Sequence, residues 1–163
     1  MGPEALIALG AALDGLDAPP QQVLDLGTGT GKAARVVARR FPAAEVVGVD
    51  LSPAMIERAK ELVPSELATR VRYEVADASA LAFEDGSFDL VVLLNMIPFF
   101  EELARVTSPQ GKVLFASAFG PETPIYVPHG TLRERLGALG FGDFREISAG
   151  AGDALLATRE NPL

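Results

Sequence analysis

Hydrophobic residues along the chain follow two alternating patterns, one typical of helices and one typical of buried strands. Leu6, Leu9, Leu13 and Leu16 recur at spacings of 3, 4 and 3 residues, which predicts an amphipathic helix ending before Pro19-Pro20. Further along, short continuous runs of valine and leucine alternate with helical segments. This alternation is typical of a parallel sheet whose strands are buried on both faces.

The remaining pattern predicts five strands, three more helices and a closing hairpin. The strands are expected at 22–27, 45–50, 70–75, 87–94 and 111–117, the helices at 32–41, 53–62 and 131–139, and the hairpin strands at 144–149 and 153–158. Ser52 is expected to cap the helix that begins at Pro53. This order predicts an α/β fold with a doubly wound, mostly parallel seven-stranded sheet, helices on both faces and a C-terminal antiparallel hairpin. Ligands of such sheets bind beyond the carboxyl ends of the strands.

No internal repeat, low-complexity stretch or lapse in the hydrophobic pattern divides the chain. A length of 163 residues suits one domain and is short for two. We therefore expect a single domain over 1–163, with residues 1–20 forming an N-terminal helix and residues 21–163 the core.

Cysteine and histidine usage narrows the chemistry. The chain has no cysteine and a single histidine, His129. This excludes cysteine–zinc sites, thiol nucleophiles and multi-histidine metal centres, and a Ser-His-Asp triad would have to include His129. We expect no metal site, and the absence of cysteine fits a reducing compartment such as the cytoplasm.

Charge and hydropathy limit the partners. Fourteen basic and 22 acidic residues give a net charge of −8 without a basic segment, which argues against nucleic-acid binding. The longest uncharged apolar run, 90–100, has 11 residues and includes Asn95 and Pro98, whereas a membrane span needs roughly 20. These features predict a cytoplasmic protein that acts on small molecules.

A glycine-rich turn follows the first predicted strand, with the sequence Asp25-Leu-Gly-Thr-Gly-Thr-Gly31. Its glycines permit a tight turn and let a ligand approach the backbone. The spacing differs from the dinucleotide fingerprint, because Lys32 stands where the third glycine is needed, and from the P-loop, because Ala33 follows Gly31-Lys32. An acid two residues before the first glycine suits a ligand that carries an ammonium group better than it suits a pyrophosphate.

Five segments in this order resemble the class I S-adenosylmethionine-dependent methyltransferases. They are Val23-Leu-Asp-Leu-Gly-Thr-Gly-Thr-Gly31, Val46-Val-Gly-Val-Asp-Leu-Ser-Pro-Ala-Met55, Ala76-Asp-Ala78, Gly86-Ser-Phe-Asp-Leu-Val-Val92 and Leu103-Ala-Arg-Val-Thr-Ser-Pro-Gln-Gly-Lys112. Together they cover most of the chain. The resemblance implies a Rossmann-like methyltransferase fold and S-adenosyl-L-methionine as the cofactor.

The resemblance also implies a set of cofactor-binding residues. Asp50 would accept the ribose hydroxyls, and Asp77 the adenine amino group. Leu51 and Met55 would contact the adenine ring, to which Ala78 would offer its amide, and Asn95 would face the methionine portion or cap the next helix. The implied cofactor-binding set is Asp25, Gly27, Thr28, Gly29, Gly31, Asp50, Leu51, Met55, Asp77, Ala78 and Asn95. Asp89 is expected to be structural.

The chemistry implied by the resemblance is transfer of a methyl group to an oxygen or nitrogen of a small-molecule acceptor, mainly through proximity and orientation. The catalytic residue is not identified by the sequence. His129 is a candidate base, and a surface histidine beside a helix start is the alternative. Relatives often carry a histidine pair after the fourth strand, where this chain has the apolar stretch 96–100.

The stretch 100–105 is shorter than in typical relatives, so we expect a truncated helix and an open acceptor site. A large acceptor, a partner subunit in a homodimer or additional chain would close such a site. Two other functions remain open. A nicotinamide-dependent oxidoreductase shares the overall pattern but disagrees with the glycine spacing and with Asp25. A non-catalytic methyltransferase-like module would explain the missing histidines.

Overall fold

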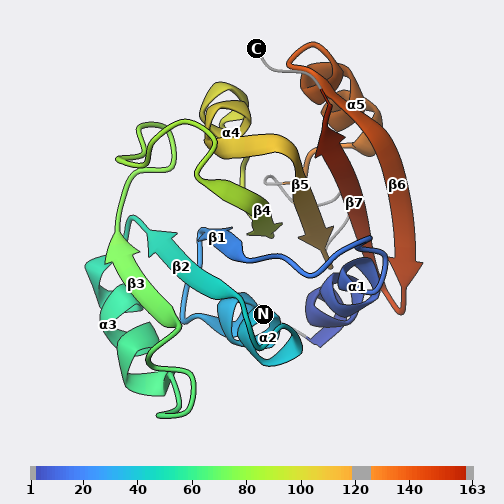
Figure 1. Cartoon of the computed structure of the whole chain (residues 1–163). Coiled ribbons are helices and arrows are strands. Elements are labelled where there is room, and N and C mark those ends of the chain that lie inside the picture. Colours follow the sequence, from blue (N-terminus) through green and yellow to red (C-terminus); the bar gives the residue numbers. More distant parts are fainter. Residues whose placement is uncertain (1–2, 119–125, 161–163) are drawn as a thin grey trace.

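The computed structural model describes residues 3–118 and 126–160, which form a seven-stranded sheet with helices on both faces (Figure 1). The elements in chain order are α1 (Pro3–Leu13), β1 (Gln22–Leu26), α2 (Lys32–Arg40), β2 (Glu45–Asp50), α3 (Pro53–Leu62), β3 (Val71–Val75), β4 (Phe88–Leu94), α4 (Phe100–Val106), β5 (Thr107–Ser117), α5 (His129–Gly137), β6 (Phe141–Ala149) and β7 (Gly152–Arg159). The strand order is β3-β2-β1-β4-β5-β7-β6.

Strand direction divides the sheet into two parts. The neighbours from β3 to β5 all pair in parallel, whereas β7 pairs antiparallel with both β5 and β6. The predicted doubly wound fold with an antiparallel C-terminal end is therefore confirmed. None of the helices among the described residues has the length and apolarity that a bilayer crossing requires.

Alternate residues of the central strands pack into two separate core layers. Val23 and Val46 face a layer with side chains of α1, α2 and α3, whereas Leu24 and Val47 face a layer with α4 and α5. Figure 1 shows the same division of helices between the two faces of the sheet. Burial on both faces explains why these strands read as continuous apolar runs rather than as alternating patterns.

Asp89 lies at the edge of the sheet opposite the carboxyl ends of the parallel strands, near the start of β4. Its carboxylate accepts hydrogen bonds from the backbone amides of Gln21 and Gln22 at 2.9–3.1 Å. These bonds fix the entry into β1. The structural role expected for Asp89 is confirmed.

Two predicted boundaries near the ends of helices were wrong. The helix α1 ends at Leu13 and does not continue to the residues before Pro19-Pro20, because the chain tightens there: the Gly15 amide donates to the Ala12 carbonyl at 3.0 Å. The helix α5 begins at His129 rather than Thr131, since Pro128 supplies the extended residue that precedes its first turn. His129 therefore belongs to the helix and not to the loop before it.

Two predicted strands start earlier than expected. The strand β5 begins at Thr107 because Phe88 pairs with Thr107 and Leu90 with Lys112, so residues 108–111 form a bulge inside the strand. The strand β6 begins at Phe141, with a second irregularity between Gly142 and Arg145. The helix α4 spans only 7 residues, as the truncated stretch predicted.

The reversed strand β7 brings its first residues to the ligand edge of the sheet. Parallel strands β1 to β5 end at this edge, and Ser117 at the end of β5 pairs with Asp153 at the start of β7. The site residues can therefore come from the ends of five strands and from the beginning of a sixth.

Candidate functional site

The glycine-rich turn leaves β1 and leads directly into α2. Gly27, Gly29 and Gly31 have φ angles of +69°, +55° and +87°, a left-handed conformation that glycine adopts without a side-chain clash. A Cβ atom at Gly27 would lie 2.6 Å from the Met96 sulfur. The Thr28 amide bonds the Val49 carbonyl at 2.9 Å, which ties the turn to β2. The turn therefore presents bare backbone at the ligand edge.

Asp25 is a buried carboxylate beneath this turn, with 1% of its surface exposed. One oxygen accepts a hydrogen bond from the Thr28 hydroxyl at 2.7 Å, and the other has no hydrogen-bond partner among the described residues. Burial raises the pKa of Asp25 to about 7. The Thr28 hydroxyl and the nearby Ala34 amide lower this pKa, but their effects are smaller than that of burial. The negative charge of Asp50 adds to the rise.

Asp50 ends β2 and fastens it to the glycine turn. One of its carboxylate oxygens accepts the Gly29 amide at 3.0 Å, and the other accepts the Ser52 amide at 3.0 Å. Ser52 in turn caps α3, as predicted, by accepting the Met55 amide at 3.2 Å. Because a carboxylate has about four acceptor positions, Asp50 can bind two further donors.

A cleft of about 130 Å³ opens beside Asp50. Its walls include Leu51, Asp77 and Ala78, together with Met96 and Phe99. Leu51 is 68% exposed, so its side chain is free to cover a ligand in the cleft. The structure thus brings together three residues that the sequence assigned to adenine binding.

Asp77 has its carboxylate held in a local turn. One oxygen accepts both the Ser79 amide at 2.9 Å and the Ser79 hydroxyl at 2.7 Å. These two hydrogen bonds lower the pKa of the Asp77 carboxyl. Asp77 is therefore an oriented anion that can accept hydrogen bonds from a ligand.

Met55 lies in a neighbouring groove rather than beside Leu51. This groove has a volume of about 380 Å³, and Asp25, the glycine turn and Leu94 also line it. Gly27 lines both spaces, so the groove and the cleft flank the same backbone turn. The two together offer one long ligand path from Asp25 to Asp77.

Asn95 ends β4 with a left-handed φ of 52°. Its side-chain oxygen accepts the Ala118 amide at 3.3 Å, which ties β4 to the end of β5, while its Nδ2 has no partner among the described residues. The helix α4 is preceded by Phe99 and not by Asn95, so the alternative of a helix cap was wrong. The side chain lines a third cavity.

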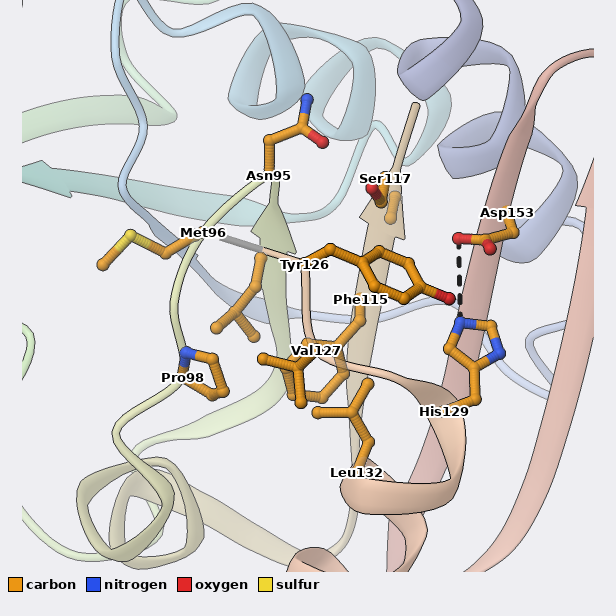
Figure 2. Close-up of a pocket in the computed structure, with 12 residues that line it drawn as sticks. Asn95, Met96, Pro98, Phe115, Ser117, Tyr126, Val127, His129, Leu132 and Asp153 are labelled. Carbon is orange, nitrogen blue, oxygen red and sulfur yellow. Dashed lines mark ion pairs between the residues drawn. The ribbon is translucent and has the colours of Figure 1, made fainter. Parts of the chain in front are cut away.

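This third cavity is shown in Figure 2. Most of its walls are apolar, Asn95 and Ser117 line it as well, and one end carries His129, Tyr126 and Asp153. Met96 lines both this cavity and the cleft of Asp50, which makes it the side chain between the two spaces. We call this third space the acceptor pocket.

His129 faces the acceptor pocket from the first turn of α5, and only 15% of its side chain is exposed. Its Nδ1 lies 2.8 Å from a Glu146 carboxylate oxygen, and its Nε2 lies 3.7 Å from Asp153. The structure thus disagrees with the alternative of a solvent-exposed surface histidine.

Four residues of the site were missed in the sequence: Met96, Tyr126, Glu146 and Asp153. Only Asp153 could have been found from the sequence. It begins the last strand of a predicted antiparallel hairpin, and such a strand starts at the ligand edge of the sheet. The other three depend on side-chain directions. Among the residues that the structure describes, no group of three or more His, Asp or Glu side chains is arranged to hold a metal ion.

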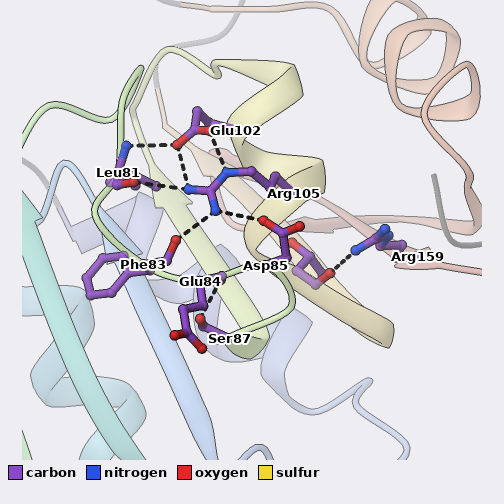
Figure 3. A network of polar contacts seen from close by, with 9 residues as sticks. Leu81, Phe83, Glu84, Asp85, Ser87, Glu102, Arg105 and Arg159 are labelled. Atoms are coloured by element: carbon purple, nitrogen blue, oxygen red, sulfur yellow. Dashed lines mark hydrogen bonds and ion pairs between the residues drawn. The ribbon is translucent and has the colours of Figure 1, made fainter.

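Arg105 supports the wall of the cleft from behind (Figure 3). Its guanidinium donates to the carbonyls of Leu81 and Phe83 at 3.0 and 2.7 Å and pairs with Glu102 and Asp85. Glu102 also accepts the Leu81 amide at 2.8 Å. The loop between β3 and β4, which begins with the cleft residues, is held by this network.

Comparisons with known proteins agree with this geometry. A family described as "Methyltransferase domain" matches residues 23–111, more than half of the chain. Malonyl-[acyl-carrier protein] O-methyltransferase of Halorhodospira halophila is 46% identical over 111 residues, which cover 64% of this chain and 37% of that protein. Demethylmenaquinone methyltransferase of Thermus thermophilus is 39% identical over 106 residues, 61% of this chain and 48% of that protein.

A solved structure gives the same fold. Phosphoethanolamine N-methyltransferase 2 of Haemonchus contortus, in complex with S-adenosyl-L-methionine, superposes with a TM-score of 0.75 at 23% identity, over 94% of this chain and 52% of that chain. The chain spans less than half of the length of the two curated relatives named above. On the family match and the shared architecture, the chain belongs to the methyltransferase domain family and has the Rossmann-like fold of the class I S-adenosylmethionine-dependent methyltransferases.

Proposed function

We propose that this chain binds S-adenosyl-L-methionine along the path from Asp25 to Asp77. The observation that carries the proposal is the buried, unpartnered oxygen of Asp25 beside a turn of three left-handed glycines. A buried carboxylate without a partner is costly, and a ligand ammonium group would complete it. The amino-acid end of the ligand would therefore lie in the groove of Asp25 and Met55.

The other half of the ligand fits the cleft of Asp50. The Asp50 carboxylate, with two acceptor positions remaining, would receive the ribose hydroxyls, and Leu51, Asp77 and Ala78 would hold the adenine. Gly27 has no side chain where the ligand must cross between the two spaces. The glycine turn, Thr28 included, sets the shape of this crossing.

We propose that the reaction is methyl transfer to an oxygen or nitrogen of a small molecule in the acceptor pocket. S-adenosyl-L-methionine supplies the methyl group on a sulfonium, which needs no covalent help from the protein. The protein binds the acceptor, aligns it and excludes water, and orientation of this kind is worth up to roughly 7–11 kcal/mol. The name of one relative, demethylmenaquinone methyltransferase, supports a small acceptor, and the name of the other, malonyl-[acyl-carrier protein] O-methyltransferase, supports transfer to an oxygen.

Several finer expectations stay predictions. The net charge of −8 supports a small molecule over a nucleic acid, and the absence of cysteine supports a cytoplasmic setting. A single domain is expected, with an open acceptor site that either admits a large acceptor or is closed by a second copy of the chain. Solution mass and protease resistance with and without S-adenosylhomocysteine would test this closure, and a protected monomer would contradict it.

Calorimetric titration with S-adenosyl-L-methionine and S-adenosylhomocysteine tests the proposal. Asp50→Asn should weaken both affinities by about 10- to 100-fold, because a charge-assisted hydrogen bond contributes roughly 1.5–3 kcal/mol. Asp89→Asn is the matched control, a carboxylate that also binds two backbone amides but at the opposite edge. Its affinities should match the wild type.

Three results would change the conclusion. Near-normal affinity in Asp50→Asn would show that Asp50 does not bind the ribose. Binding of a nicotinamide dinucleotide without any binding of S-adenosyl-L-methionine would favour an oxidoreductase. Binding without turnover on any acceptor would leave a methyltransferase-like binding module.

A further inference from the structure

The polar end of the acceptor pocket is built by three segments that are distant in sequence. His129 of α5, Tyr126 just before α5 and Asp153 at the start of β7 line the pocket, and Glu146 of β6 contacts His129 without lining the pocket itself. Figure 2 shows the Tyr126 hydroxyl, an Asp153 oxygen and a ring nitrogen of His129 converging at one end of the cavity. This cluster lies in the pocket but has no role in the binding of the adenosyl ligand proposed above.

Glu146 fixes the orientation and the tautomer of the imidazole. Its Oε1 lies 2.8 Å from Nδ1 of His129, and a carboxylate can only accept, so Nδ1 carries a proton. Arg133 holds the other oxygen of Glu146 at 3.1 Å. In the neutral imidazole the lone pair of Nε2 is therefore directed away from Glu146 and toward Asp153.

Asp153 supplies negative charge next to that lone pair. Its Oδ1 lies 3.7 Å from Nε2, too far for a hydrogen bond, and has no hydrogen-bond partner among the described residues. Burial, followed by the charges of Asp153 and Glu146, raises the pKa of the Tyr126 hydroxyl, so Tyr126 stays a neutral donor. The cluster therefore has room for one more proton at Nε2, between two carboxylates that would stabilise the resulting imidazolium.

Most of the other side chains that line the pocket are apolar. They include Leu93, Pro98, Phe115, Val127 and Leu132, while Asn95 and Ser117 add two polar groups. Such walls disfavour an acceptor that arrives as an ammonium ion, because its charge would be desolvated. They accept the flat, neutral face of an unsaturated ring.

We propose that His129 is the general base of the acceptor site and that the acceptor is a phenol or enol, a neutral ring-borne hydroxyl group. This inference rests on the proposed function. Glu146 and Asp153 are positioning residues, which orient the imidazole and stabilise its protonated form. A base of this kind contributes typically 10²- to 10⁴-fold in rate.

The step balances without a further reactant. The acceptor hydroxyl gives its proton to Nε2 of His129, and its oxygen forms a bond to the methyl carbon. The sulfur–methyl bond breaks, its electron pair stays on sulfur, and S-adenosylhomocysteine is the product. After the product leaves, Nε2 returns this proton to solvent past the partly exposed Asp153, and Nδ1 keeps its own proton for Glu146.

The first experiment uses the wild-type chain saturated with S-adenosylhomocysteine, with 4-nitrophenol as the probe. The pH is set so that the free probe is predominantly neutral, and its phenolate is followed by absorbance. His129 is the only histidine, so one pair of ring ¹⁵N signals reports its protonation. We expect a saturable, several-fold rise in the phenolate fraction at one probe per chain, together with protonation of Nε2.

Variants test the assignment by a second route. His129→Gln should abolish the phenolate rise and lower kcat for single-ring phenols at least 100-fold, with KM changed less than about threefold. Glu134→Gln, which alters an exposed side chain of the same helix α5, is the control and should behave as the wild type. Glu146→Gln should lower kcat more than it raises KM, whereas a merely structural loss would reduce thermal stability and both parameters.

The outcomes separate the two proposals. Failure of the wild type to bind S-adenosylhomocysteine in calorimetry would reject the proposed function. If S-adenosylhomocysteine binds normally, three results would overturn only the assignment of His129. They are the absence of phenolate formation, an Nε2 that is already protonated before the probe is added, and full activity in His129→Gln. Turnover of matched anilines but not of phenols would overturn the acceptor class.

Discussion

The Thr28 hydroxyl donates a 2.7 Å hydrogen bond to one carboxylate oxygen of Asp25, while the second oxygen is buried without a partner among the described residues. Thr28 belongs to the glycine turn, so the turn and the carboxylate form a single unit. Half of the hydrogen-bonding capacity of Asp25 is thus satisfied within the protein. The other half is directed at the space where the proposed ligand carries its ammonium group.

Asp25 should make ligand affinity dependent on pH. Its pKa is about 7 in the folded chain, so the carboxylate is ionised at pH 8 and mostly protonated at pH 6. Because only the carboxylate pairs with an ammonium group, the affinity for S-adenosyl-L-methionine should fall as the pH is lowered through 7, by up to about tenfold per pH unit. Calorimetry across this range checks the slope, and Asp25→Asn should bind weakly at every pH. An affinity that does not change between pH 8 and 6 would contradict the pairing.

The same carboxylate should lower stability at high pH. The pKa of Asp25 is raised from 3.8 to about 7 by folding, so its contribution to the free energy of unfolding decreases as the pH rises from about 4 to 7 and stays constant above 7. Asp25→Asn removes this cost and keeps an acceptor for Thr28. The variant should be more stable than the wild type at pH 8, by up to about 4 kcal/mol, with the difference shrinking toward pH 4. Urea unfolding at both pH values measures it, and a variant destabilised at pH 8 would refute the assignment.

Gly27→Ala should prevent binding of the proposed ligand. The φ of +69° is unfavourable for alanine, and the new Cβ would contact the Met96 sulfur at 2.6 Å. We expect at least a tenfold loss of affinity and about 1 kcal/mol of destabilisation. Gly10→Ala is the control, since it lies in α1 with nothing within 4 Å of its added Cβ and should stabilise the chain by about 0.5–1 kcal/mol. Unchanged affinity in Gly27→Ala would mean that the ligand avoids this turn.

Arg105 should contribute far more to stability than a surface arginine. Arg105→Leu removes donors from the carbonyls of Leu81 and Phe83 and leaves Glu102 unpaired, which should cost about 2–4 kcal/mol in thermal or urea unfolding. Arg58→Leu removes an exposed pair with Glu61 and should change stability by less than about 1 kcal/mol. Equal losses in the two variants would show that the loop before β4 does not depend on the network.

Most of the fold, and the grouping of the residues proposed for the adenosyl site, could be predicted because they depend on local sequence. Asp50 and Asp77 follow successive parallel strands, and parallel strands end at one edge, so their proximity follows from order alone. The antiparallel end was also predictable, since two apolar runs flank a short glycine turn. The boundaries of β5 were not, because the bulge at residues 108–111 depends on pairing with β4.

The acceptor pocket could not be predicted from the sequence, because its lining depends on the directions of side chains that come from distant elements. His129 was identified as a residue, but its partners Glu146 and Asp153 meet it only after β6 and β7 pair. Met55 was expected beside Leu51 and instead faces the neighbouring groove, because α3 turns its first side chains toward the glycine turn. Met96 was counted only among the apolar residues after β4, although it separates two cavities.

The reversal of β7 has a consequence for how this enzyme type could diversify. Residues up to Phe99 line the groove and the cleft proposed for the adenosyl ligand, whereas the polar end of the acceptor pocket comes from the segment 126–153. The two halves of the proposed reaction are thus encoded largely in consecutive blocks, with Met96 lining both spaces. Grafting the C-terminal block of one homologue onto the N-terminal block of another should exchange substrate preference while the methyl-donor affinity is inherited unchanged.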